Sequence, residues 1–243
     1  MSTFILIHGA WHGGWCWEKV KYILEQNGHI VLAPDLPGHG EDKTPICEIS
    51  LASYVDCVCD LLDRQQEKVI LVGHSLGGLT ITQAAEKRPD NIEVLVYLSA
   101  LLLRNGDSRH SISDSEPRGS MLAEYRELNK KEGYSTVKEQ GSEKVFYNDC
   151  SDDDILWAKS KLVPQSLQPM DVPMSTSKKN FGSVRRMYIE CLQDKAIIPE
   201  FQKKMYTELP CEKVITMNTS HSPFLSAPRE LANHLIFLSN PTA

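Results

Sequence analysis

Short apolar runs alternate along this chain with amphipathic, helix-like segments. The strand-like runs are mostly apolar and lie at 4–7, 30–33, 69–72, 94–99, 186–191 and 213–217. Segments with apolar residues at helical spacing separate them, at 15–26, 51–64, 76–87, 199–209 and 228–238. Strands that are apolar on both sides and alternate with helices are typical of a parallel sheet covered on both faces. The pattern therefore predicts an α/β fold with a mostly parallel sheet of about six strands flanked by helices.

One stretch, at about 104–181, departs from this rhythm. It is rich in Ser, Asp, Glu and Lys, and its apolar residues are dispersed: Met121, Leu122, Phe146, Trp157, Met170 and Met174. Structureless loops of this length are rare in compact domains. We therefore expect a helical cap, inserted after the fourth strand, over the carboxyl ends of the strands. The chain then forms one domain, 1–243, with a core of 1–103 and 182–243.

Composition narrows the possible partners. The 243 residues are 41% hydrophobic and 24% charged, the formal net charge is −6, and no basic run occurs. Nucleic-acid binding, which depends on clustered Lys and Arg, is not expected. No apolar stretch is long enough to span a membrane. The seven cysteines are scattered, so reduced thiols and a cytoplasmic location are expected, without disulfides or a metal site. Monomer and homodimer both stay open.

The most informative segment is 69–78, which reads VILVGHSLGG. An apolar strand ends there in Gly-x-Ser-x-Gly and an amphipathic helix follows. In that motif a serine projects from a sharp strand-to-helix turn, and Gly73 and Gly77 remove side chains where strand and helix approach closely. Ser75 is therefore the candidate nucleophile. His74, next to it, is interpreted as a packing residue that points away.

The candidate base and acid follow Ser75 in the chain order serine, acid, histidine that this motif favours. His221 lies in the loop after the last strand and is the one downstream histidine in such a loop, since His110 falls in the expected cap and His234 in the last helix. Asp194 comes shortly after the preceding strand, where a carboxylate can orient the histidine ring. Ser75, Asp194 and His221 thus form the predicted triad.

A glycine-rich turn, HGAWHGGW at 8–15, follows the first strand. Such a turn can direct a backbone N–H at a carbonyl oxygen, together with the N–H of the residue after the nucleophile, which assigns an oxyanion hole to Ala10 and Leu76. A metal site from His8 and His12 lacks further ligands, and a phosphate loop lacks the Gly-Lys signature. Candidates for the substrate pocket are Gly9, Trp11, His12, Leu101, Trp157 and Phe224.

With these residues assigned, the chain resembles the plant-type methylesterase and hydroxynitrile lyase family of α/β-hydrolases over nearly its whole length. The similar segments are HGAWHGGW at 8–15, GH at 28–29, EKVILVGHSLGG at 67–78, CSDDD at 150–154, LVPQSL at 162–167, FGSVRR at 181–186, DK at 194–195 and PEFQ at 199–202. The resemblance implies the α/β-hydrolase fold, a compact helical cap, an apolar gorge and a Ser-His-Asp mechanism without cofactor or metal.

Two branches of that family differ at the site. The lyases carry threonine at the position of Gly9 and lysine directly after the catalytic histidine, where this chain has Ser222. The resemblance therefore implies a serine esterase that hydrolyses a small methyl, alkyl or aryl carboxylic ester through an acyl-enzyme. A carbon–carbon lyase of the hydroxynitrile type and a ligand receptor on a hydrolase scaffold are the alternatives. The acyl and alcohol groups stay open, as does the choice between ester, lactone and thioester.

Overall fold

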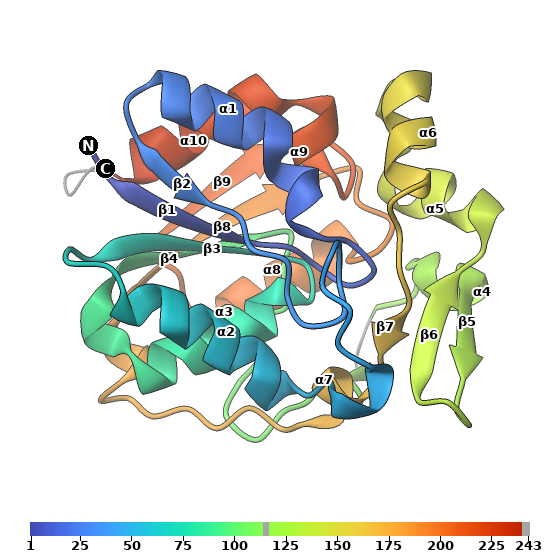
Figure 1. Ribbon diagram of the computed structural model, residues 1–243, viewed down its shortest axis with the longest axis horizontal. Coiled ribbons are helices and arrows are strands. Elements are labelled where there is room, and N and C mark those ends of the chain that lie inside the picture. The colour runs from blue at the N-terminus through green and yellow to red at the C-terminus, as the bar shows by residue number, and fades with distance from the viewer. Residues whose placement is uncertain (114–116, 240–243) are drawn as a thin grey trace.

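The computed structural model describes residues 1–113 and 117–239. Residues 114–116 of the expected cap and 240–243 of the expected core lie outside the described residues. Six parallel strands form the main sheet, in the spatial order β2-β1-β3-β4-β8-β9 (Figure 1). Their bounds are Thr3–Ile7 for β1, Ile30–Leu32 for β2, Val69–His74 for β3, Ile92–Leu98 for β4, Arg185–Cys191 for β8 and Lys213–Met217 for β9. The predicted parallel six-stranded sheet is confirmed.

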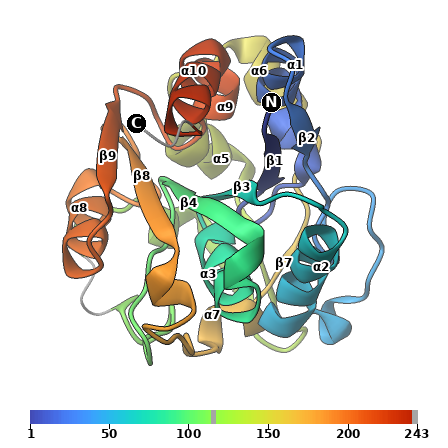
Figure 2. The same ribbon diagram turned by 90° about the vertical axis from the view of Figure 1, so that its left-hand side faces the viewer.

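Helices cover both faces of this sheet. Helices α1 and α10 lie on one face, and α2, α3 and α8 lie on the other (Figures 1 and 2). Their bounds are Glu18–Gln26 for α1, Leu51–Asp63 for α2, Gly77–Lys87 for α3, Pro199–Glu208 for α8 and Pro228–Leu238 for α10. Short helices outside the cap include α9 (Pro223–Ser226) and the 3-10 helices η1 (Gly14–Trp17), η2 (Ile46–Glu48), η3 (Pro89–Asn91) and η5 (Phe181–Ser183). Because both faces are covered, every residue of β3 is buried.

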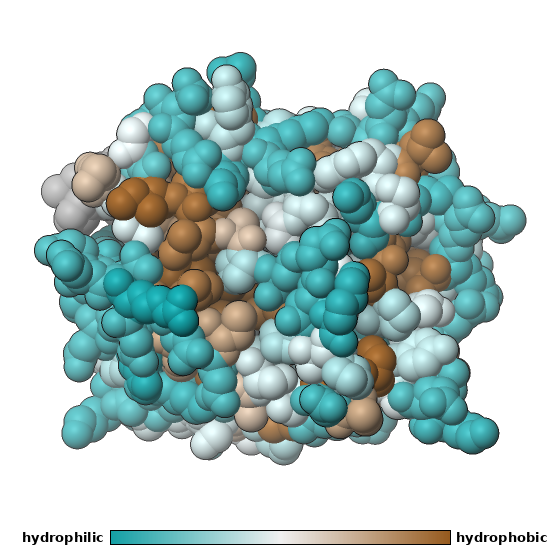
Figure 3. Space-filling model, in the orientation of Figure 1, coloured by the Kyte–Doolittle hydropathy of each residue, from teal (hydrophilic) through white to brown (hydrophobic). Residues whose placement is uncertain are grey.

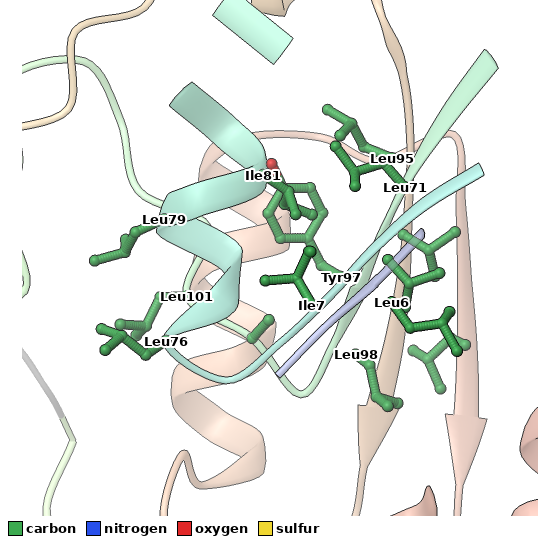
Figure 4. Packing of buried hydrophobic residues seen from close by; sticks show 14 of the residues in the cluster. Leu6, Ile7, Leu71, Leu76, Leu79, Ile81, Leu95, Tyr97, Leu98 and Leu101 are labelled. Carbon is green, nitrogen blue, oxygen red and sulfur yellow. The ribbon is translucent and has the colours of Figure 1, made fainter. Parts of the chain in front are cut away.

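Helix α3 begins beside the Ser75 turn and packs on the sheet. In Figure 4 its Ile81 lies beside Tyr97 of β4, while Leu76 and Leu101 lie next to each other near the start of the helix. The Tyr97 hydroxyl is completely buried and lies 2.7 Å from Oγ1 of Thr82, so its polar group has a partner inside the apolar core. This packing fixes where α3 begins, two residues after Ser75.

The insertion between β4 and β8 forms a cap past the carboxyl ends of the strands (Figure 1). Its elements are α4 (Leu122–Tyr125), β5 (Arg126–Asn129), β6 (Tyr134–Val137), α5 (Glu139–Phe146), α6 (Asp152–Lys159), β7 (Gln165–Ser166) and α7 (Gln168–Asp171). The expected helices are present in the cap, and β5, β6 and β7 add a small antiparallel sheet that the sequence did not predict. The physical reason is local: three of the four residues of β6 are aromatic or β-branched, and Gly133, at φ +74°, makes the tight turn before it.

The face in Figure 3 is mostly hydrophilic, with hydrophobic side chains gathered over the β1 and β2 region. Within 1–113 and 117–239, no helix is long and apolar enough to cross a bilayer. The same residues contain no cluster of three or more His, Cys, Asp or Glu side chains suited to a metal ion.

Candidate active site

Ser75 sits on a sharp turn between β3 and α3. Its φ of +52° lies in the left-handed region, which costs a non-glycine residue free energy and persists only where the surroundings impose it. The turn is held by two backbone hydrogen bonds, from Ser75 N to Leu98 O at 3.3 Å and from Leu101 N to Ser75 O at 3.0 Å. Ser75 is also the one residue of 69–80 that is not buried. Within this segment, Ser75 is therefore the residue that solvent reaches.

Close backbone approach explains two glycines around Ser75. A Cβ at Gly77 would lie 2.7 Å from the carbonyl oxygen of His8, so only glycine lets α3 start against the loop after β1. A Cβ at Gly9 would lie 2.7 Å from Cβ of Ser75. Gly9 was expected in the pocket wall; instead its Cα packs against the Cβ side of Ser75.

His221 and Asp194 meet beneath the cap. Nδ1 of His221 donates to Oδ2 of Asp194 at 2.7 Å, and both residues are at most 3% exposed. A proton on Nδ1 leaves the lone pair on Nε2, which is the nitrogen a general base needs. The structure therefore brings together the acid and the base that were predicted 27 residues apart in the chain.

Asp194 accepts hydrogen bonds from four further groups. Its Oδ1 receives the backbone N–H of Ala196 at 2.7 Å and of Ile197 at 3.0 Å. Its Oδ2 receives the Ser99 hydroxyl and, at 3.2 Å, Nε2 of Gln202. A buried carboxylate needs such donors to replace lost water, and here they also fix its direction towards His221.

His74 links the turn at Ser75 to the His221 loop. Its Nε2 donates to the carbonyl oxygen of His221 at 2.8 Å, and the two ring centroids are 4.5 Å apart. Burial, and then the neighbouring His221, lower the pKa of His74 well below its ordinary value, so the ring stays neutral. His74 therefore positions the loop that carries His221, in line with its interpretation as a packing residue.

Within the described residues, the Ser75 hydroxyl and the His221 ring make no hydrogen bond to each other, although the His74 contacts bring their backbones together. Hydrogen bonds of this kind are often long before substrate binds and tighten in the complex. The Ser75 hydroxyl turns about a single Cα–Cβ bond, so a change of rotamer moves its oxygen without moving the backbone.

The turn at 8–15 is fixed by its own side chains and by the cap. Nδ1 of His12 donates to the Ala10 carbonyl at 2.8 Å, and Nε2 of His12 accepts from the Tyr147 hydroxyl at 2.8 Å. Trp11, at φ +62°, donates from Nε1 to the Ser135 carbonyl of β6 at 3.0 Å. Ala10 is thus held from both sides, as a residue that presents a backbone N–H to an oxyanion must be.

Leu76 supplies the second predicted N–H. It immediately precedes α3, and the first amides of a helix have no intrahelical acceptor. Ala10, Leu76 and Ser75 all line one narrow cavity of about 30 Å³. The remaining lining residues are Trp11, Leu101, Arg109, Leu122, Arg126, Phe146, Met170, Ala196 and Ile197.

Three other pocket candidates lie outside this lining. His12 packs behind the Ala10 turn, with its ring stacked on Trp15 at 5.3 Å. Trp157 contacts the edge of Trp15 at 5.1 Å on the outer side of that turn. Phe224 is completely buried beneath His74, at 4.9 Å between ring centroids. Only Trp11 and Leu101 of the expected wall face the cavity, because aromatic side chains here also fill the core behind the site.

The comparison with known sequences decides the family. The profile described as the alpha/beta hydrolase family matches residues 4–234. The chain belongs to the alpha/beta hydrolase family. Salicylic acid-binding protein 2 of Nicotiana tabacum is 34% identical to this hydrolase over 260 residues, which cover 98% of the chain and 96% of the relative. Methylesterase 2 of Arabidopsis thaliana is 35% identical over 259 residues, with 98% and 95% covered. The resemblance to the plant-type methylesterases is confirmed.

Not every relative matches over its full length. The hydrolase is 34% identical over 246 residues to putative methylesterase 11, chloroplastic, of Arabidopsis thaliana, which covers 97% of this chain but only 63% of that relative. Among solved structures, polyneuridine aldehyde esterase superposes with a TM-score of 0.89 at 30% identity, covering 99% of this chain and 100% of the other. A pyrethroid hydrolase from Sphingobium faniae JZ-2 gives 0.90 at 30% identity, covering 99% and 98%.

The structure of this alpha/beta hydrolase adds site residues that the sequence motifs do not mark. Ser99 directly follows β4, so the rule that functional groups lie at carboxyl strand ends could have found it. Asp149 of the cap accepts from the Ser220 N–H at 2.8 Å and from the Ser220 hydroxyl. No spacing rule connects residue 149 with residue 220, and only the fold of the cap brings them together. Asp149 therefore joins the cap to the loop that carries His221.

Proposed function

We propose that this alpha/beta hydrolase is a serine esterase that cleaves a small carboxylic ester through Ser75, His221 and Asp194. The observation that carries the proposal is the Nδ1–H of His221 on the buried Asp194 carboxylate, beside a serine exposed on a strained turn. Relatives named methylesterase and a solved structure named polyneuridine aldehyde esterase support a carboxylic ester, and among esters a methyl ester.

The reaction follows from where the groups lie. Nε2 of His221 removes the proton as Ser75 Oγ attacks the ester carbonyl, and the N–H groups of Ala10 and Leu76 stabilise the resulting oxyanion. The imidazolium formed on His221 faces Asp194 and then protonates the departing alkoxide. Water, activated by the same ring, then releases the acid from the acyl-enzyme. Every proton in this cycle moves through His221.

Three other buried histidines near the site are uncharged at neutral pH. Burial lowers the pKa of His12 to about 4 and that of His8 and His74 well below the ordinary value. These three rings therefore carry no charge at neutral pH that would oppose protonation of His221. For a lyase, the family pattern needs a cation directly after the catalytic histidine, and the residue there is the fully buried Ser222.

Substitution of the nucleophile tests the proposal. We expect Ser75→Ala to lower kcat/KM for 4-nitrophenyl acetate and for methyl pentanoate by at least about 10⁴-fold, because the covalent route is lost. Ser183→Ala, an exposed serine far from the cavity, is the matched control and should retain wild-type turnover. Equal turnover by Ser75→Ala and wild type would contradict an esterase. A single turnover with retained product would instead favour the receptor alternative.

A further inference from the structure

Two arginines stand in the wall of the cavity that contains Ser75. Arg109 lies in the segment after β4 and Arg126 is the first residue of β5, so both belong to the cap. Both are partly buried. Among the described residues that line this cavity, none is acidic, and Ser75 is the one other polar side chain. The described lining of this cavity therefore combines Ser75 and two arginines with mostly apolar side chains.

The backbone around Arg109 is fixed rather than left to solvent. Ser108 and Ser111 exchange reciprocal hydrogen bonds, from Ser108 N to Ser111 Oγ at 2.8 Å and from Ser111 N to Ser108 Oγ at 3.0 Å. The neighbouring His110 N–H donates to the carbonyl of Met170 in α7 at 3.2 Å. Arg109 therefore projects from a turn that these hydrogen bonds stabilise.

Arg126 reaches the same residue of α7. Its Nη1 lies 3.9 Å from Sδ of Met170, a weak acceptor, and its backbone pairs with Val137 of β6. Met170 therefore connects the backbone beside Arg109 with the side chain of Arg126. Both arginines also make additional interactions within the protein. Both arginines line the cavity that contains Ser75.

The proposed ester chemistry does not need these charges. The oxyanion at Ser75 is served by backbone N–H groups, and the proton moves through His221. A guanidinium has a planar set of donors that matches a carboxylate in two-point contact, and a wall with little water strengthens that contact. Two such groups opposite a reactive serine are suited to a substrate with a negative group apart from the bond that is cleaved.

Resting on the proposed esterase function, we propose that the substrate is an acidic ester, in which a free carboxylate lies against Arg109 and Arg126 while the ester carbonyl lies at Ser75. The relevant class is the monoester of a dicarboxylic acid. Charge-assisted hydrogen bonds to such a carboxylate should favour it over a neutral ester of equal size by roughly 10- to 100-fold in kcat/KM.

Matched pairs of methyl esters test this preference. Monomethyl glutarate and methyl pentanoate differ by a carboxylate in place of a methyl group, and so do monomethyl terephthalate and methyl 4-methylbenzoate. Methanol release gives kcat/KM for each, and the ratio of acidic to neutral ester is compared in wild type, Arg109→Gln, Arg126→Gln and the exposed control Lys131→Gln. A ratio does not change with the fraction of folded enzyme, so a destabilised variant stays informative.

We expect at least one pair to favour the acidic ester tenfold or more in wild type. The ratio should fall by more than threefold in Arg109→Gln or Arg126→Gln and stay unchanged in Lys131→Gln. Salt should lower the wild-type ratio, because it screens partly exposed charges. A wild-type ratio of one or less in both pairs, or ratios within threefold of wild type in both arginine variants, would overturn the acidic-ester proposal.

The same experiment separates this proposal from the function beneath it. Ser75-dependent hydrolysis of the neutral esters with no response to the arginines overturns the acidic-ester preference alone. Absence of Ser75-dependent hydrolysis for all four esters, and for 4-nitrophenyl acetate, overturns the esterase function as well.

Discussion

The core sheet and the cap face one cavity from opposite sides and contribute different kinds of groups. The core provides Ser75, His221 and Asp194, each placed at the carboxyl end of a parallel strand. The cap provides side chains that surround a substrate, such as Phe146 and Arg126. The difference separates reaction from recognition: substitutions in the core should change the rate for every ester, and those at cap residues that line the cavity should change the preference among esters.

Two carboxylates test this separation, because Asp194 belongs to the core and Asp149 to the cap. We expect Asp194→Asn to lower kcat/KM about 10⁴-fold for all esters. The amide would favour the wrong tautomer of His221 and could not stabilise its cation. Steady-state kinetics on the neutral and acidic methyl esters would measure the loss, which should be uniform across them.

Asp149→Asn is the matched comparison. The amide can still accept from the Ser220 N–H but loses its second acceptor, so the His221 loop shifts slightly and kcat falls roughly tenfold. Asp153→Asn, an exposed residue in the first turn of α6, should behave as wild type. Losses of equal size at Asp149 and Asp194 would contradict the division between core and cap.

The contact between His12 and Tyr147 joins the two regions and should make stability depend on pH. The pKa of His12 is lowered to about 4 by burial, whereas the unfolded chain takes up this proton near pH 6.5. The unfolded state therefore binds more protons between these values, and stability is full above pH 6.5 and falls as pH drops. The contribution of His12 between pH 6.5 and 5 is about 2 kcal/mol.

Urea unfolding at several pH values would measure this effect. The pH dependence should be weaker by about that amount in His12→Gln and unchanged in His110→Gln, whose side chain is exposed. An identical pH dependence in wild type and His12→Gln would show that His12 carries a proton in the folded protein, contrary to its hydrogen bonds with Ala10 and Tyr147.

The sequence predicts the core much better than the cap. Apolar runs and the Gly-x-Ser-x-Gly motif are local signals, and they suffice for the parallel sheet and for the strand-end positions of Ser75, Asp194 and His221. The cap lacks such signals: its apolar residues are dispersed, and the antiparallel strands are short. The contacts that define its role, such as Asp149 with Ser220, join residues 71 positions apart. The cytoplasmic location stays a prediction.

Aromatic residues show most clearly what the sequence alone does not predict. Trp11, Trp157 and Phe224 were all predicted as candidates for the pocket wall. Only Trp11 faces the cavity, because its left-handed backbone turns it towards the cap, where Ser135 accepts from its indole N–H. Burial alone does not distinguish a side chain that borders a substrate from one that supports the wall behind it.

Covalent labelling tests the central claim most directly. The protein is treated with a phosphonofluoridate, which reacts with activated serines, and the modified residue is mapped by mass spectrometry in wild type and in His221→Ala. The arrangement of Ser75, His221 and Asp194 predicts one modified residue, Ser75, and loss of labelling in the variant. Modification of a different residue, or labelling of Ser75 at the same rate without the imidazole, would contradict it.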